Sequence, residues 1–154
     1  MNFVSKYFNW LQKDNPRNIV ESYPEIDEQK ETSVQGVYIV GDLTGIPLLR
    51  LAADGGTKIV KQLFSDQKAT SEKEESTDVY DLIIVGAGPA GISAAIECKK
   101  KNINYIILES NRILNTIENF PKEKPITLKP DGVQLELPLK MNDGFKETLL
   151  EELT

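Results

Sequence analysis

Histidine is absent from the 154 residues, and cysteine occurs once, at Cys98. Without histidine, nucleophilic catalysis by a Ser–His or Cys–His pair is excluded. A single cysteine excludes an internal disulfide or dithiol and fits a reducing compartment. No acidic cluster has the spacing of metal ligands. We therefore predict a cytoplasmic protein without a metal site, in which Cys98 is a buried, inert thiol.

Excess basic charge and long apolar runs are also lacking. The net charge of −6 disfavours nucleic acid as a partner, because phosphates require a basic face. No apolar run approaches the ~20 residues of a membrane span, and the N-terminus does not resemble a secretory signal. Apolar residues at helical spacing over 2–13 predict a short amphipathic helix. Its polar face is not basic, which favours packing over membrane anchoring. We expect neither a nucleic acid nor a membrane partner.

The most informative stretch spans residues 79–110, VYDLIIVGAGPAGISAAIECKKKNINYIILES. A short β-branched run at 82–85 is typical of a strand buried in a parallel sheet. A G-x-G-x-x-G turn follows and opens a helix, and a second apolar run at 105–108 stops at an acid. This order predicts one strand–helix–strand unit of an α/β, Rossmann-like parallel sheet with flanking helices.

The glycine spacing has a specific chemical meaning. Gly86 allows the tight turn, Gly88 lets the backbone approach a pyrophosphate, and Gly91 lets the helix pack on the sheet. Pro89 suits the first helical turn. Glu109 stands 18 residues after Gly91, where an acid reaches an adenosine ribose hydroxyl and disfavours a 2′-phosphate. The alternative is a glycine-rich turn that holds no ligand.

A second stretch, GVYIVGDLTGIPLL, predicts a strand at 37–40 that ends at Gly41 and Asp42 and leads into a helix reaching about residue 64. Asp42 would accept hydrogen bonds from ligand hydroxyls or, alternatively, cap the helix. The pair Gly55 and Gly56 predicts either a bend or a close neighbour. We expect strand 37–40 beside strand 82–85, directly or with a gap, so that both motifs share one sheet edge.

The remaining segments define the predicted organisation. Residues 65–78 contain one apolar side chain and predict a flexible linker. We expect the parts at 1–64 and 79–154 to form one domain. Beyond the acid, the pattern predicts a turn or helix at 111–117, short strands at 126–128 and 133–137, and a final helix at 143–153.

Three segments resemble one family. YDLIIVGAGPAGISAA resembles the flavin-binding start of the pyridine nucleotide-disulfide oxidoreductase superfamily, especially thioredoxin-reductase-like flavoproteins. GVYIVGDLTGIPLL is similar to the Gly-Asp motif of that family. NTIENFPKEKPITLKP is similar to a loop in its bacillithiol-disulfide-reductase-like branch. The resemblance implies an incomplete FAD/NAD(P)-binding domain, with FAD as cofactor and NAD(P)H as electron donor to the parent enzyme.

Carried over residue by residue, the resemblance assigns the pyrophosphate to the glycine turn and the adenosine ribose to Glu109. Asp42 would lie at the ribityl or pyrophosphate region, and the turn beginning at Thr44 near the isoalloxazine. The predicted cofactor-binding residues are Gly41, Asp42, Thr44, Gly86, Ala87, Gly88, Pro89, Ala90, Gly91, Glu109 and Ser110.

This sequence departs from the family in two ways. The Gly-Asp motif precedes the glycine turn, whereas in the family it follows it. A second G-x-G-x-x-G and a Cys-x-x-Cys are absent, so the nicotinamide domain would come from a longer, permuted chain or from a partner chain. The sequence thus predicts the FAD-binding part of an NAD(P)H-dependent oxidoreductase or, alternatively, a non-catalytic FAD or NAD binding module.

Overall fold

The computed structural model describes residues 23–65, 79–129 and 132–153. The predicted helix at 2–13 and nearly all of the predicted linker, residues 66–78, lie outside these ranges. In chain order the elements are η1 Gly41–Thr44, α2 Leu49–Leu63, β1 Leu82–Val85, α3 Pro89–Lys100, β2 Tyr105–Leu108, α4 Asn115–Glu118, β3 Pro125–Ile126, β4 Gly144–Phe145 and α5 Lys146–Leu153.

The strand–helix–strand unit forms as predicted. β1 and β2 are parallel, with Leu82 opposite Tyr105 and Val85 opposite Leu108. α3 begins at Pro89, whose missing N–H costs nothing in the first turn. Ile84 faces inward and is buried, whereas Ile83 and Val85 face outward and are exposed, as the twofold alternation of a strand requires. The α/β class with a small parallel sheet is confirmed.

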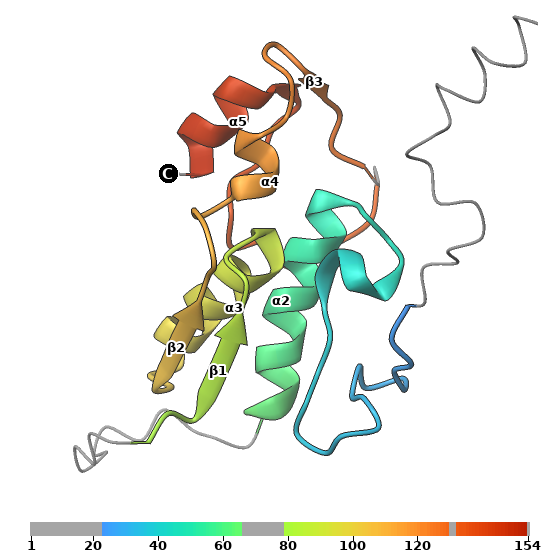
Figure 1. Cartoon of the computed structure of the whole chain (residues 1–154), viewed down its shortest axis with the longest axis vertical. Helices are drawn as coiled ribbons and strands as arrows, with labels where there is room; N and C mark the ends of the chain where they lie inside the picture. The colour runs from blue at the N-terminus through green and yellow to red at the C-terminus, as the bar shows by residue number, and fades with distance from the viewer. Residues whose placement is uncertain (1–22, 66–78, 130–131, 154) are drawn as a thin grey trace, which may run out of the picture.

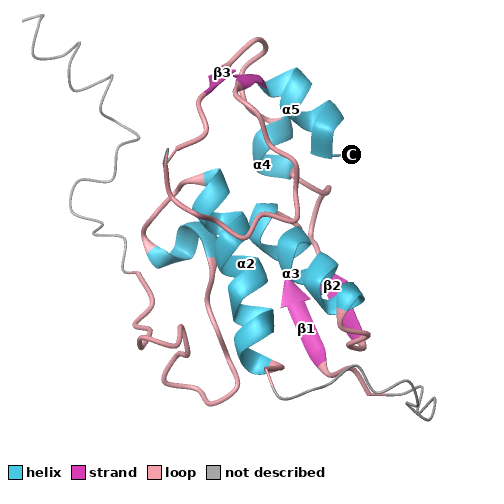
Figure 2. Ribbon diagram, turned by 180° about the vertical axis from the view of Figure 1, so that it is seen from behind, coloured by secondary structure: helices cyan, strands magenta, loops and turns pink. Residues whose placement is uncertain are grey.

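The two long helices, α2 and α3, pack against each other, and α3 lies against both strands of this sheet (Figures 1 and 2). Their contact is close at Gly56, where an added Cβ would lie 2.0 Å from the carbonyl oxygen of Ala90. α2 runs without interruption from Leu49 to Leu63. Of the two explanations for the glycine pair, the close neighbour is therefore correct.

The predicted strand at 37–40 is wrong as a strand of this sheet. Within the described residues β1 pairs only with β2, which leaves β1 at an edge and not in the centre. Residues 37–40 are instead held by an isolated antiparallel bridge between Tyr38 and Glu31. A strand is defined by its partner, and β1 is separated from this segment by a cleft lined by both.

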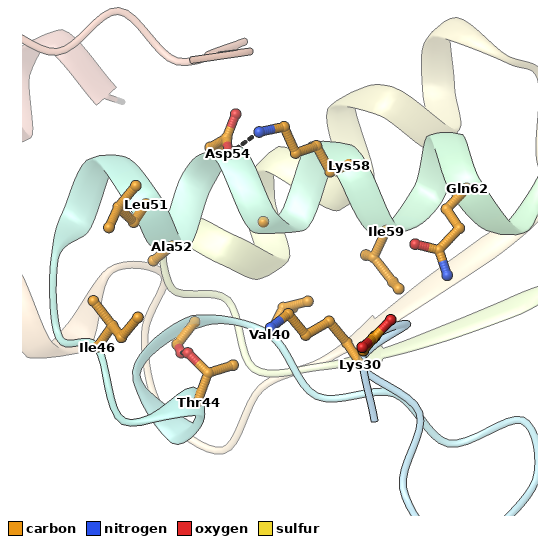
Figure 3. Close-up of a pocket in the computed structure, with 13 residues that line it drawn as sticks. Lys30, Val40, Thr44, Ile46, Leu51, Ala52, Asp54, Lys58, Ile59 and Gln62 are labelled. Carbon is orange, nitrogen blue, oxygen red and sulfur yellow. Dashed lines mark hydrogen bonds and ion pairs between the residues drawn. The ribbon is translucent and has the colours of Figure 1, made fainter. Parts of the chain in front are cut away.

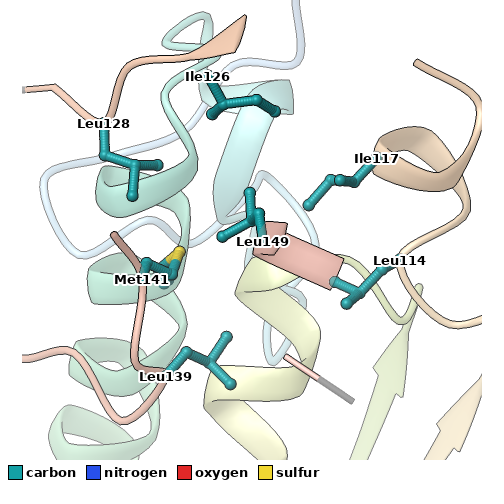
Figure 4. Packing of buried hydrophobic residues seen from close by; sticks show 8 residues of the cluster. Leu114, Ile117, Ile126, Leu128, Leu139, Met141 and Leu149 are labelled. Carbon is teal, nitrogen blue, oxygen red and sulfur yellow. The ribbon is translucent and has the colours of Figure 1, made fainter. Parts of the chain in front are cut away.

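The C-terminal part packs over one end of the two helices (Figure 1). β3 pairs with β4, so the predicted strand at 133–137 does not form, and the final helix begins at Lys146, after the predicted start. A buried cluster joins this part to α2 through Ala53. Its other members are Leu114, Ile117, Ile126, Leu128, Leu139, Met141 and Leu149 (Figure 4). Among the described residues, no helix has the length and apolar character needed to cross a membrane.

Candidate dinucleotide site

The glycine turn joins β1 to α3 in a conformation that backbone hydrogen bonds hold in place. Gly86 has φ +99°, a region that favours glycine, and its N–H donates to the carbonyl of Leu108 on β2 at 2.8 Å. At Gly91 a Cβ would lie 2.0 Å from the carbonyl oxygen of Gly86. The first and third glycines of the motif are therefore required by the fold itself.

Gly88 differs from its two neighbours in the motif. Its φ of −78° and ψ of −175° are extended values that other residues adopt, and no atom lies within 4 Å of where its Cβ would be. Neither backbone conformation nor internal packing requires a glycine here. The missing side chain leaves open space in front of the first turn of α3, where the N–H groups of Ala90 and Gly91 have no intrahelical partner.

Glu109 lies directly against this turn. Its Oε2 accepts a hydrogen bond from the Ala87 N–H at 2.7 Å, and its Oε1 accepts one from the Asn111 N–H at 2.9 Å. The hydroxyl of Ser110 approaches the same Oε1 at 3.4 Å. The Ala87 N–H, followed by the Asn111 N–H, holds the pKa of Glu109 below its usual value. The carboxylate therefore stays ionised at neutral pH, and its exposed side retains lone pairs for further donors.

The Gly-Asp motif meets the glycine turn at the start of α3. A Cβ at Gly41, which has φ +78°, would lie 3.1 Å from the Cβ of Ala90. Asp42 stands beside this contact with an exposed side chain. The Thr44 hydroxyl donates to the Gly41 carbonyl at 2.8 Å, which closes the turn.

Asp42 does not cap a helix. Val40 is the N-cap of η1 and Leu48 that of α2, and neither helix start has a side-chain cap hydrogen bond. The capping alternative is therefore wrong. Because Asp42 is not needed as a cap, its exposed carboxylate is available to a ligand that lies beside the contact of Gly41 with Ala90.

A cavity of about 380 Å³ lies between the Gly-Asp turn and the face of α2 that carries Leu51, Asp54 and Lys58 (Figure 3). Of the predicted site residues, it includes only Gly41 and Thr44. Its buried carboxylate, Asp54, is fully engaged, because it pairs with Lys58 at 2.7 Å and accepts the Glu136 N–H at 2.8 Å. These contacts give Asp54 a structural role, in anchoring residues 133–137 to α2.

Cys98 is fully buried on the inner side of α3. Burial raises the pKa of its thiol to about 11, so the reactive thiolate is scarce at neutral pH. The prediction of a buried, inert thiol is confirmed on both burial and ionisation. Within the described ranges, no group of three acidic or cysteine side chains has the arrangement of a metal site.

Comparison with known proteins identifies the family of the region that contains the glycine turn. Residues 83–138 match the family model described as pyridine nucleotide-disulphide oxidoreductase. This region belongs to the pyridine nucleotide-disulphide oxidoreductase family. The chain is 46% identical to thioredoxin reductase of Mycoplasma genitalium over 63 residues, which are 37% of this chain and 20% of that protein.

Other relatives give matches of similar extent. Bacilliredoxin reductase Bdr of Bacillus subtilis is 44% identical over 39 residues, 25% of this chain and 12% of that protein. Thioredoxin reductase of Listeria monocytogenes is 36% identical over 75 residues, 45% of this chain and 22% of that protein. The chain thus spans between 12% and 22% of the length of these three relatives. No solved structure matches it.

The matched family region contains most of the predicted site residues, whereas Gly41, Asp42 and Thr44 lie outside it.

The sequence did not reveal two backbone N–H groups that shape the site. The Asn111 N–H orients Glu109, and the Leu114 N–H donates to the Ala87 carbonyl at 2.9 Å, so that Ala87 is held on both sides. Leu114 has φ +58° and carries no turn signal, which is why the sequence did not reveal it.

Proposed function

We propose that this chain binds FAD and forms the FAD-binding part of a flavin-dependent oxidoreductase that uses NAD(P)H. The open space at Gly88 carries the proposal, because neither conformation nor packing accounts for the glycine. A pyrophosphate would use that space and the N–H groups of the first turn of α3. When bound, FAD supplies the redox chemistry. A longer chain or a partner chain would supply the nicotinamide domain.

The chain's own residues would position the two ends of such a ligand. Glu109 is ionised and has remaining lone pairs, so it would accept hydrogen bonds from the adenosine ribose hydroxyls. Asp42 stands next to the contact of Gly41 with Ala90 and would accept hydrogen bonds from the flavin half of FAD. The negative charge on Glu109 would also disfavour a 2′-phosphate, which suits FAD.

A second candidate is a binding module that holds FAD or NAD without turnover. It is favoured by the sequence, which contains one G-x-G-x-x-G and no Cys-x-x-Cys. Purification separates the two. A yellow protein whose pigment is bleached by NAD(P)H supports a flavoenzyme, whereas a colourless protein that binds NAD or ADP-ribose supports the module.

Replacing Glu109 with alanine is expected to weaken both FAD and ADP-ribose by roughly ten- to a hundredfold, because hydrogen bonds to a charged acceptor contribute ~1.5–3 kcal/mol. Asp42→Asn keeps the side-chain size but removes the charge, so it is expected to weaken FAD and leave ADP-ribose nearly unchanged. Isothermal titration of both ligands against both variants measures this difference. Unchanged FAD affinity in Asp42→Asn would remove Asp42 from the site.

Gly88→Ala provides an independent test of the open space. The new methyl group meets no protein atom, so stability is expected to change by less than about 1 kcal/mol. FAD affinity is expected to fall at least roughly tenfold, because the methyl group occupies the place proposed for the pyrophosphate. Gly91→Ala is the matched control. Its methyl group would clash with the Gly86 carbonyl, so this variant is expected to lose stability, which Gly88→Ala is not. Full FAD affinity in a folded Gly88→Ala variant contradicts the proposal.

A further inference from the structure

The direction of the Gly88 N–H depends on its neighbour in the chain. A peptide unit is planar, and in its trans form the N–H and the carbonyl point in opposite directions. The Gly88 N–H shares one peptide unit with the Ala87 carbonyl, so whatever fixes that carbonyl also fixes the N–H. Among the described residues nothing accepts a hydrogen bond from the Gly88 N–H, which leaves this donor to a ligand.

Three consecutive peptide units of the glycine turn are each held by a residue of β2 or of the segment after it. The Gly86 N–H donates to the Leu108 carbonyl at 2.8 Å. The Ala87 N–H donates to Glu109 Oε2 at 2.7 Å. The third unit is held through its carbonyl, because the Ala87 oxygen accepts the Leu114 N–H at 2.9 Å. The orientation of the Gly88 N–H, which points away from Leu114, therefore rests on this last bond.

The glycine at position 88 makes this third hydrogen bond necessary. If the peptide unit between Ala87 and Gly88 turned over, the φ of Gly88 would change from −78° to roughly +100°, a value that glycine adopts as readily. The residue that leaves space for a ligand thus also removes the steric barrier to the flip. The flipped unit would present the Ala87 carbonyl, an acceptor, where a phosphate oxygen needs a donor.

The surroundings of Leu114 keep its N–H in place. Its φ of 58° and ψ of 26° are left-handed values that leucine adopts rarely. Its side chain is 1% exposed and belongs to the buried cluster that α2, α4 and α5 share (Figure 4). Its carbonyl accepts the N–H groups of Ile117 and Glu118 in α4. Burial and these two bonds stabilise the backbone conformation that directs the N–H at the glycine turn.

We propose that Leu114 is a positioning residue of the dinucleotide site. Its N–H locks the peptide unit between Ala87 and Gly88, so that the Gly88 N–H and not the Ala87 carbonyl faces the phosphates. The identity of the ligand rests on the proposed function, whereas the lock is a property of the chain itself. The buried C-terminal cluster thereby contributes to the site, although it contains none of the predicted binding residues.

The full chain carrying the α-hydroxy analogue of leucine at position 114 tests this lock. The replacement turns the amide into an ester, so it removes the N–H and keeps the buried side chain. Without ligand, NMR relaxation dispersion of the Gly88 amide is expected to be flat in the parent chain and to show microsecond-to-millisecond motion in the Leu114 ester. The matched control is the same replacement at Ile117, whose N–H bonds within α4, and it should leave the Gly88 amide flat.

Adding Gly88→Ala to the Leu114 ester provides a rescue. Alanine disfavours the φ of the flipped unit, so the dispersion at position 88 is expected to disappear. Dispersion that persists in this double variant, or that both esters show, would make Leu114 a purely structural residue and overturn the proposal. A flat Gly88 amide in a folded Leu114 ester overturns it as well. So does the absence, in the unmodified chain, of scalar coupling across the hydrogen bond from Leu114 to Ala87.

FAD affinity is the functional readout of the same variants. The Leu114 ester is expected to bind FAD roughly three- to tenfold more weakly than the parent chain, and the Ile117 ester within about twofold of it, because only the first loses a bond that orients the site. Equal affinity of the Leu114 ester and the parent chain contradicts the proposal. A parent chain that binds no FAD would refute the proposed function, whereas the lock is decided by the Gly88 amide without any ligand.

Discussion

Replacing Gly56 with alanine is expected to lower the free energy of unfolding by about 3 kcal/mol. The added methyl carbon would lie 2.0 Å from the carbonyl oxygen of Ala90 and 2.8 Å from its carbonyl carbon. Both atoms belong to the backbone of α3 in its first turn, so no side-chain rotation relieves the clash. The two helices must move apart, which opens the interface that buries Val60 and Ala53. Urea denaturation followed by circular dichroism measures the change.

Gly55→Ala is the matched control, one residue earlier in the same helix. Its Cβ would have a single neighbour, the Val40 Cβ, at an ordinary 3.9 Å. Because alanine is a better helix former than glycine, this variant is expected to gain up to about 1 kcal/mol. Equal effects of the two substitutions would contradict direct packing of α2 on α3 at Gly56.

Leu149→Ala is expected to cost about 3 kcal/mol, within the range for buried leucine. Leu149 is 1% exposed and lies on α5 among Leu114, Ile117 and Met141 (Figure 4). Truncation removes apolar burial and leaves a cavity between the C-terminal part and the two long helices. The same urea denaturation measures the loss.

Leu43→Ala removes the same atoms from a leucine that is 62% exposed. Its effect is expected to stay within about 0.5 kcal/mol, because little burial is lost. If the two leucine variants were equally stable, α5 would not be part of the core. A loss confined to Leu149→Ala instead ties residues 112–153 to the same cooperative unit as α2 and α3.

The sequence by itself determined the unit that contains the glycine turn. The bounds of β1 and β2, their parallel pairing and the start of α3 at Pro89 all follow from local signals. These signals are strong because each is complete within a few residues. β-branched runs favour strands, Gly86 accepts the φ of +99° that the turn requires, and Pro89 favours the first turn of a helix. The position of Glu109 beside the turn follows from the same spacing.

Tertiary structure alone decided the remaining features. The pattern of residues 37–40 is that of a buried strand, but a strand forms only where a neighbouring chain completes its hydrogen bonds, and here a cleft takes that place. Gly55 and Gly56 look equivalent in the sequence, yet Gly56 avoids a clash with the backbone of Ala90, whereas Gly55 has only an ordinary contact with Val40. A glycine in the sequence shows only that a side chain is absent at that position. What fills the space in its place depends on contacts between residues far apart in the chain, which no local pattern encodes.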